Sequence, residues 1–467
     1  MNARFDRFSS RSRGRLITTF GIFLAILSSA SCLARASEDQ TVNGRVPLLS
    51  NEAAWKRLPP VESGGGQPLP SWARALAGAL PYTTAATLEL DRLYRTSDSL
   101  DPKLAGTIRL VVAQTLHSDY GRATADADLI RAGVDRPSID RLLNDRAALP
   151  EAERNVLAFA ERLSLAGYTT TDEEVASLVR TYGEARVVAI VLQIAYANFL
   201  DRLVLALGLP VEQGGPIPPL EVRFVAPGTA GIPGAARPAL PSVEKVQPTP
   251  EATDPDWARL NFAQLQDRLE GQRDRKPRVS IPTWEEFREA LPEGLYPRSK
   301  PLRIRWSLLV SGRQPKLGPA WIKCLRVFEE EAKQDRVFEE SLFWVVTRSL
   351  RCFYCMGHCE MLLGVAGLDR EAIAARTSKL ASDDWSSFPP AERSAFGFAR
   401  KLTRTPWEID DSDIKKLQDA FGPERALDVI WWSSRCQFMT KVSDAFQLQL
   451  ERENVFKDHL TPDEGPK

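Results

Sequence analysis

An internal repeat limits the possible folds of this chain more than any other feature of its sequence. Ala-Gly-Val-Asp-Arg at 132–136 matches Ala-Gly-Leu-Asp-Arg at 366–370, and Ala-Glu-Arg at 152–154 matches 391–393. The offset is 234 residues at the first match and 239 at the second, so we place a five-residue insertion near 381–385. A match over this length predicts that one structural unit occurs twice.

Both copies are expected to be helical. Helix starts are indicated at Asp101-Pro102, where an acidic N-cap precedes proline, and at Pro150-Glu151 and Pro389-Pro390. Gly183 and Gly422 correspond between the copies and indicate helix ends. Because no Val/Ile-rich alternation indicates a sheet, we predict an all-α protein with two tandem bundles of about six helices each.

Composition changes along the chain divide it into seven segments. The expected segments are a secretory signal at 1–36, an irregular lead at 37–78, a first repeat at 79–209, a Pro-rich linker at 210–256, a second lead at 257–299, a second repeat at 300–455 and a polar tail at 456–467. The linker is dense in Pro, Gly and Ala, which predicts an extended, mobile segment.

The N-terminus indicates export to the periplasm or cell envelope. Three arginines precede an apolar run at 16–27, and Ala34-Arg35-Ala36 offers a cleavage site. Cys32 follows Ser-Ala-Ser, a weak version of a lipoprotein signal, so lipid anchoring is the less favoured outcome. The other very apolar run, at 187–200, is broken by polar residues and predicts a buried helix rather than a membrane span.

Charge and length set further limits. The 467 residues include 61 basic and 61 acidic side chains. The chain therefore lacks the basic excess that is typical of a nucleic-acid-binding protein. A chain of this length has room for two or three domains, each with its own core.

The segment Cys352-Phe-Tyr-Cys355-Met-Gly-His358-Cys359 is the main chemical signal. A Cys-x-x-Cys pair can cycle between dithiol and disulfide, and a neighbouring histidine can take or supply the proton. A zinc site is disfavoured because no second such pair exists, and haem attachment would need histidine directly after the second cysteine. A structural disulfide stays open, as does the choice between a buried core thiol and a third redox partner for Cys359.

The first repeat lacks this chemistry. At the 234-residue offset, Ser118, Gly121, Thr124 and Ala125 stand where the second repeat has Cys352, Cys355, His358 and Cys359. Tyr120 and Tyr354 correspond, which favours a packing role for Tyr354. We interpret the first repeat as a spent site and the second as the working one.

These residues resemble the AhpD-like family, which includes the carboxymuconolactone decarboxylases. Members are all-α bundles with a glutamate, eleven residues, Cys-x-x-Cys, three residues and a histidine, and here Glu340 precedes Cys352 by that spacing. The chain departs from the pattern at the histidine position, which holds Cys359, with His358 one residue earlier. Both positions neighbour Cys355 on a helix.

The resemblance implies thiol-dependent reduction of hydroperoxides. Cys355 would be the nucleophile, Cys352 would resolve its sulfenic acid, and His358 with Glu340 would relay the proton. An unbroken helix would place Glu340 about 18 Å from Cys352, so this role requires a chain reversal, a water bridge or a neighbouring subunit. The resemblance implies no cofactor or metal, an unidentified dithiol reductant and a homo-oligomer. Two alternatives stay open, namely a lyase acting on a lactone acid and a helical scaffold stapled by a disulfide.

Overall fold

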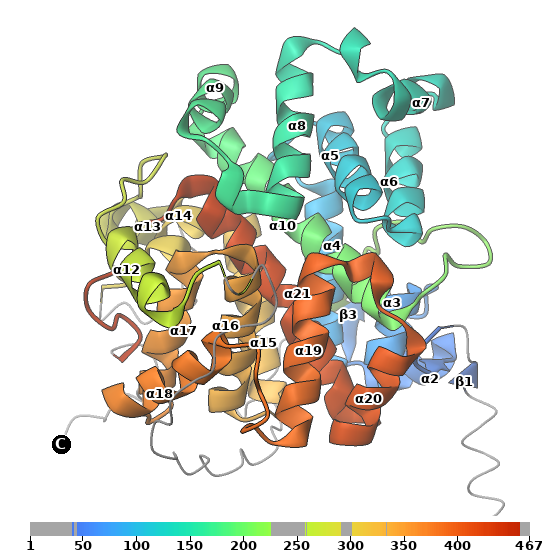
Figure 1. Cartoon of the computed structure of the whole chain (residues 1–467). Coiled ribbons are helices and arrows are strands. Elements are labelled where there is room, and N and C mark those ends of the chain that lie inside the picture. Colours follow the sequence, from blue (N-terminus) through green and yellow to red (C-terminus); the bar gives the residue numbers. More distant parts are fainter. Residues whose placement is uncertain are drawn as a thin grey trace, which may run out of the picture.

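The computed structural model describes residues 40–41, 44–225, 257, 259–290, 301–332 and 334–457. Helices dominate this part of the chain (Figure 1), and its strands form two short antiparallel pairs. These pairs are β1 (Gln40–Thr41) with β2 (Leu48–Leu49), and β3 (Val61–Ser63) with β4 (Arg223–Phe224). The all-α prediction is confirmed. The expected signal at 1–36, Cys32 and most of the expected linker lie outside the described residues.

The helices before the linker lead from the surface into a long central helix. They are α2 (Asn51–Arg57), α3 (Ser71–Leu76), α4 (Pro81–Thr96), α5 (Pro102–Thr115), α6 (Asp119–Arg131), α7 (Arg136–Asn144), η1 (Arg146–Ala148), α8 (Glu151–Ala166), η2 (Gly167–Thr169), α9 (Asp172–Tyr182) and α10 (Glu184–Leu207).

The helices after the linker repeat this order from α14 onward. They are α12 (Phe262–Gln272), α13 (Trp284–Ala290), α14 (Arg305–Arg313), α15 (Leu317–Glu331), α16 (Arg336–Leu350), α17 (Phe353–Val365), α18 (Arg370–Ala381), α19 (Pro390–Arg404), η3 (Pro406–Glu408), α20 (Asp411–Phe421) and α21 (Pro423–Phe446). Corresponding turns share backbone geometry, because His117 and Arg351 both have a positive φ, at 55° and 54°.

Local sequence signals explain most helix boundaries. Asp101 caps α5, accepting from the N–H groups of the next turn, and Thr171 forms a capping box at the start of α9. Gly183 and Gly422, with φ of 77° and 79°, each end one helix and directly precede the next. At these two positions the positive φ favours glycine.

The two repeats share one hydrophobic core. The long helices α10 and α21 pack extensively against each other, and the main apolar cluster runs from Val46 to Val455. Phe199 of α10 meets Trp321 and Trp431 of the second repeat edge-on, with ring centroids 5.3 and 5.7 Å apart. Glu331 of α15 accepts the backbone N–H groups at the start of α4, at 3.0 and 2.7 Å. Side chains of each repeat therefore fill the core of the other, and Glu331 of the second repeat caps a helix of the first.

Helix α10 is long and apolar enough to cross a membrane, and no other helix in the described ranges passes that test. Its most apolar stretch is completely buried inside the protein. The prediction of a buried helix at 187–200 is confirmed.

The first residues of the expected linker, 210–225, are packed against the protein rather than extended and mobile. Glu212 accepts a hydrogen bond from the Ser71 N–H at 2.7 Å, the Ile217 carbonyl accepts one from Arg95, and β4 pairs with β3. Residues 210–225 are therefore packed on the lead segment and the first repeat, where their side chains and backbone groups find partners.

Candidate active site

A tight chain reversal between α16 and α17 positions the cysteine segment. Helix α16 ends at Leu350, Arg351 adopts the left-handed conformation, and Cys352 is the N-cap of α17. Glu340 on α16 and Cys355 on α17 consequently line one cavity. The reversal removes the separation of about 18 Å that a single straight helix would have imposed.

The cavity beside the cysteines has a volume of about 170 Å³. Much of its wall is apolar, including Trp306, Leu325, Phe343, Met439 and Phe456. Its polar lining includes side chains that the sequence analysis singled out and several that it did not: Ser307, Arg326, Glu329, Arg336, Glu340, Tyr354, Cys355, His358 and Arg435.

The two motif cysteines have different surroundings. All five cysteines of the described residues are free thiols, and all are buried. Cys355 faces the cavity, and its sulfur lies 3.1 Å from Ser443 Oγ. Cys352 does not line the cavity, and its thiol lies beside Cys355 and Asp444. Burial raises the pKa of the Cys352 thiol well above its usual range, and the hydrogen bond with Cys355 adds to the rise.

His358 pairs with a glutamate that the sequence analysis missed. Its Nε2 lies 2.7 Å from Glu451 Oε2, in the segment that follows α21. Burial alone would raise the pKa of the Glu451 carboxyl, but the His358 ring and further hydrogen bonds hold it below its usual value. An ionised Glu451 accepts the Nε2 proton and leaves Nδ1 as the ring nitrogen that can take another.

Glu340 contacts an arginine rather than His358. Its Oε1 lies 3.2 Å from Arg336 Nη1, and its Oε2 is buried without a hydrogen bond among the described residues. Burial raises the pKa of Glu340, although Arg336 and Arg435 oppose the rise. Glu451, rather than Glu340, is the hydrogen-bond partner of His358, while Glu340 and His358 both line the cavity.

Arg435 adds a buried cation to the cavity wall. Its guanidinium lies 3.5 Å from the ring centroid of Trp432 and 4.6 Å from that of Phe343. This stacking holds the planar group against aromatic faces. Its Nε is buried without a hydrogen bond among the described residues.

Tyr354 is more than a packing residue. Its hydroxyl donates to Glu451 Oε1 at 3.1 Å, and the same carboxylate accepts the Arg305 N–H at the start of α14. In the first repeat the Tyr120 hydroxyl donates to Glu212, which accepts the Ser71 N–H at the start of α3. The tyrosine survives in both repeats because it helps a glutamate to cap a helix.

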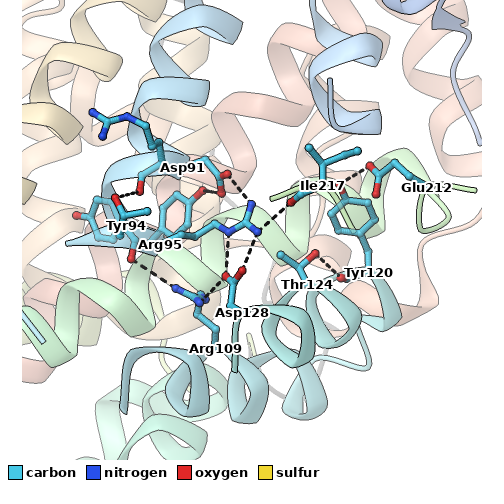
Figure 2. Close-up of polar contacts among 12 residues, drawn as sticks. Asp91, Tyr94, Arg95, Arg109, Tyr120, Thr124, Asp128, Glu212 and Ile217 are labelled. Carbon is cyan, nitrogen blue, oxygen red and sulfur yellow. Dashed lines mark hydrogen bonds and ion pairs between the residues drawn. The ribbon is translucent and has the colours of Figure 1, made fainter. Parts of the chain in front are cut away.

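This correspondence is the signal that could have identified Glu451. Glu212 and Glu451 are 239 residues apart, the offset of the later matches. Glu451 Oε2 binds His358, whereas Thr124 at the histidine position donates to its own helix (Figure 2). Glu212 Oε2 is consequently buried without a hydrogen bond among the described residues. The unpaired oxygen marks the place that a histidine fills in the second repeat.

Charged side chains of the first repeat occupy positions that line the cavity in the second. Asp91, Arg95, Arg109 and Asp128 form a buried ion-pair network (Figure 2), with Arg95 and Arg109 both contacting Asp128. At the 234-residue offset these four correspond to Leu325, Glu329, Phe343 and Leu362, which all line the cavity. The prediction that the first repeat is spent therefore has a steric explanation.

Another carboxylate occupies the place that the Cys355 side chain has in the second repeat. Asp201 Oδ1 accepts a hydrogen bond from Ser118 Oγ at 2.8 Å and lies 1.8 Å from where a Cβ on Gly121 would sit. Ser118 and Gly121 hold the positions of Cys352 and Cys355. A side chain at position 121 would collide with this carboxylate.

The remaining cysteines are core residues. Cys359, Cys324 and Cys436 are almost fully buried and absent from the cavity wall. Burial raises the pKa of Cys359 well above its usual range, which makes it a poor nucleophile. Its interpretation as a core thiol is favoured over a third redox partner.

The site contains no arrangement that could hold a metal ion among the residues the structure describes. No model of a known protein family matches the sequence, and no curated protein matches it either.

Proposed function

We propose that the second repeat is an AhpD-like thiol peroxidase that reduces organic hydroperoxides through Cys355 and Cys352. The observation that carries the proposal is the 170 Å³ cavity, in which Cys355 and His358 are exposed to one small space while Cys352 lies directly behind Cys355. Its apolar wall suits the carbon skeleton of an organic hydroperoxide better than it suits hydrogen peroxide.

The expected reaction has two steps at sulfur. The Cys355 thiolate attacks the outer oxygen of the hydroperoxide, the O–O bond breaks, and Cys355 becomes a sulfenic acid while the alkoxide leaves. The proton released by the Cys355 thiol passes through His358 to the alkoxide, which leaves as an alcohol. Cys352 then attacks the sulfenic acid, forming a disulfide and water. A dithiol reductant restores both thiols, and its identity stays open.

The position of Cys355 favours its role as nucleophile. It lies in the first turn of α17, where the helix dipole favours a thiolate. Ser443 Oγ also contacts the Met439 carbonyl, at 3.0 Å, so its hydroxyl can turn to donate to an ionised sulfur. Only Cys355 of the two cysteines faces the cavity.

A peroxide assay with matched variants tests the proposal. We expect the protein with dithiothreitol to consume cumene hydroperoxide, and Cys355→Ser to abolish consumption. Cys436→Ser is the control, because Cys436 is equally buried but lies outside the cavity wall. Unchanged consumption in Cys355→Ser would refute the peroxidase.

A lyase acting on a lactone acid is the second candidate, favoured by Arg336 and Arg435 in the cavity wall. Guanidinium groups bind substrate carboxylates, and such a reaction would not need the dithiol. Lactone turnover that persists in a Cys352→Ser, Cys355→Ser double variant would support this candidate instead.

A further inference from the structure

Helix α21 presents two consecutive side chains to the two motif cysteines. Ser443 Oγ lies 3.1 Å from the Cys355 sulfur, and the carboxyl group of the neighbouring Asp444 lies beside the Cys352 thiol. Ser443 thus contacts the sulfur that faces the cavity. Asp444 lies beside the Cys352 sulfur, which does not line the cavity.

The surroundings of Asp444 are built for a carboxyl group that changes protonation. Its Oδ2 is buried without a hydrogen bond among the described residues and lies 2.9 Å from where a Cβ on Gly167 would sit. Gly167 therefore leaves room that any other residue would fill. This unpaired oxygen is available for a proton.

The charged groups that face Asp444 come from several elements. Lys441 lies one turn earlier on α21, Arg278 approaches from the segment after α12, and Cys352 faces it from the start of α17. Lys441 is itself fully buried, donates to the Ser164 carbonyl at 3.0 Å and lies near the Arg202 cation of α10. Lys441 and Arg278 are thus the cations that offset the carboxylate.

Burial dominates the electrostatics of this group. It raises the pKa of Asp444 to about 7, against the hydrogen bond from Cys352 and the attraction of Lys441 and Arg278. Burial, with repulsion from Arg202, lowers the pKa of Lys441 to about 7. Both groups can therefore exchange a proton near neutral pH.

We propose that Asp444 is the proton acceptor for Cys352 when this thiol resolves the sulfenic acid at Cys355. The inference rests on the proposed peroxidase function and adds a catalytic residue to its second step. The proton moves from the Cys352 sulfur to Asp444 as the S–S bond forms and the C–S–OH oxygen of Cys355 leaves as hydroxide. The hydroxide takes a proton from the cavity side and becomes water. When the dithiol reductant cleaves the disulfide, Asp444 returns its proton to Cys352.

The proposal sets the direction of the pH dependence. Asp444 accepts a proton only while it is ionised, so disulfide formation should accelerate as the pH rises through about 7, the pKa of this carboxyl. Removing the Lys441 cation raises that pKa further, because its attraction favours the ionised form. The acceleration should then occur at a higher pH.

A single-turnover experiment on the full chain separates the two steps. Reduced protein is mixed with one equivalent of cumene hydroperoxide, sulfenic acid at Cys355 is trapped with dimedone, and disulfide is followed by loss of free thiols. In Asp444→Asn we expect sulfenic acid to form within about threefold of the wild-type rate, because Asp444 does not line the cavity. Disulfide formation should slow by about tenfold or more and lose its pH dependence near neutrality. Asp201→Asn removes a buried carboxylate from the spent repeat and should change neither step.

Lys441→Met provides a second variant in which Asp444 is intact. Its disulfide formation should accelerate at a pH at least one unit higher than in the wild type. Equal rates and pH profiles of disulfide formation in the wild type, Asp444→Asn and Lys441→Met would overturn the role of Asp444 while leaving the peroxidase in place. Absence of sulfenic acid at Cys355 in the wild-type protein would overturn the peroxidase itself and the inference with it.

Discussion

Glu451 joins three parts of the molecule through one carboxylate. It accepts the N–H of Arg305 at the start of α14, the hydroxyl of Tyr354 and a ring nitrogen of His358. These donors stabilise its ionised form inside the protein. The helix cap fixes the carboxylate, and the fixed carboxylate orients the histidine beside the cavity.

Replacing Glu451 by glutamine tests this role. Glu451→Gln keeps the shape but removes the carboxylate that binds His358 Nε2 and orients the ring, so peroxide reduction should fall by about a hundredfold. The rate of sulfenic acid formation at Cys355 measures the effect. Glu453→Gln is the control, because Glu453 is an exposed carboxylate two residues away that pairs with Arg303. A large loss in Glu340→Gln together with wild-type rates in Glu451→Gln would instead support the relay expected from the family resemblance.

The buried Asp201 should make stability depend on pH. Burial raises the pKa of Asp201 to about 7, whereas aspartate in an unfolded chain titrates near about 3.9. Between these values the folded state binds more protons than the unfolded state. The free energy of unfolding should therefore fall as the pH rises from about 4 to 7, by at most about 1.4 kcal/mol per pH unit.

Asp201→Asn should flatten this part of the stability curve. Urea unfolding of the wild type and the variant between pH 4.5 and 7.5 provides the comparison, and the readout is the difference in slope rather than in absolute stability. Parallel curves would show that Asp201 keeps one protonation state throughout this range.

At the residue scale, sequence reasoning identified the groups that lie close together in the chain. Cys352, Cys355 and His358 share one helix start, so their spacing alone indicated their chemistry. Glu451 lies 93 residues from His358 and Asp444 lies 92 from Cys352. Such partners are brought together by α21 packing on α17, which no local pattern describes.

At the scale of elements, local sequence signals predicted some helix boundaries and not others. The N-caps at Asp101 and Thr171 were predictable because a side chain binds the nearby backbone. The reversal after α16 was not, since Arg351 adopts a positive φ without being glycine. The Arg351 guanidinium lies over the ring of Tyr168 from the first repeat, with Cζ 4.5 Å from the ring centroid. The turn is therefore supported by a tertiary contact.

Helix α6 offers a test of the spent site. A glycine to alanine change inside a helix usually stabilises by up to about 1 kcal/mol. At Gly121 the added Cβ would lie 1.8 Å from Asp201 Oδ1, so Gly121→Ala should instead destabilise the protein by about 1–3 kcal/mol. Chemical unfolding measures the change.

Two further variants isolate the collision. Gly397→Ala in α19 should be neutral or stabilising, because nothing lies within 4 Å of its Cβ position. In an Asp201→Ala background, Gly121→Ala should lose its cost. If Gly121→Ala still lowered the free energy of unfolding in that background, the collision with Asp201 would not be the cause of its destabilising effect.

The repeat predicted two similar units, but it did not predict how they meet. Helices α10 and α21 belong to different repeats, and their apolar surfaces pack against each other. Phe199 of α10 and Phe438 of α21 correspond at the offset of 239 residues. Both rings lie against Trp321. Amphipathic patterns show that a helix is buried but do not name the partner, so this interface required the structure.

A shared core should make the whole molecule unfold as one unit. All five cysteines of the described residues belong to the second repeat, so their reactivity reports on that repeat alone, whereas circular dichroism reports on all helices. Phe199→Ala removes a buried ring of the first repeat and should cost about 3–5 kcal/mol. We expect thiol exposure and helix loss to shift together to lower denaturant with coincident midpoints. Leu165→Ala, at an exposed position on α8, should move neither curve. If thiol exposure kept its wild-type midpoint while helix loss became biphasic, the repeats would be independent folding units, and the first could not act as a scaffold for the site in the second.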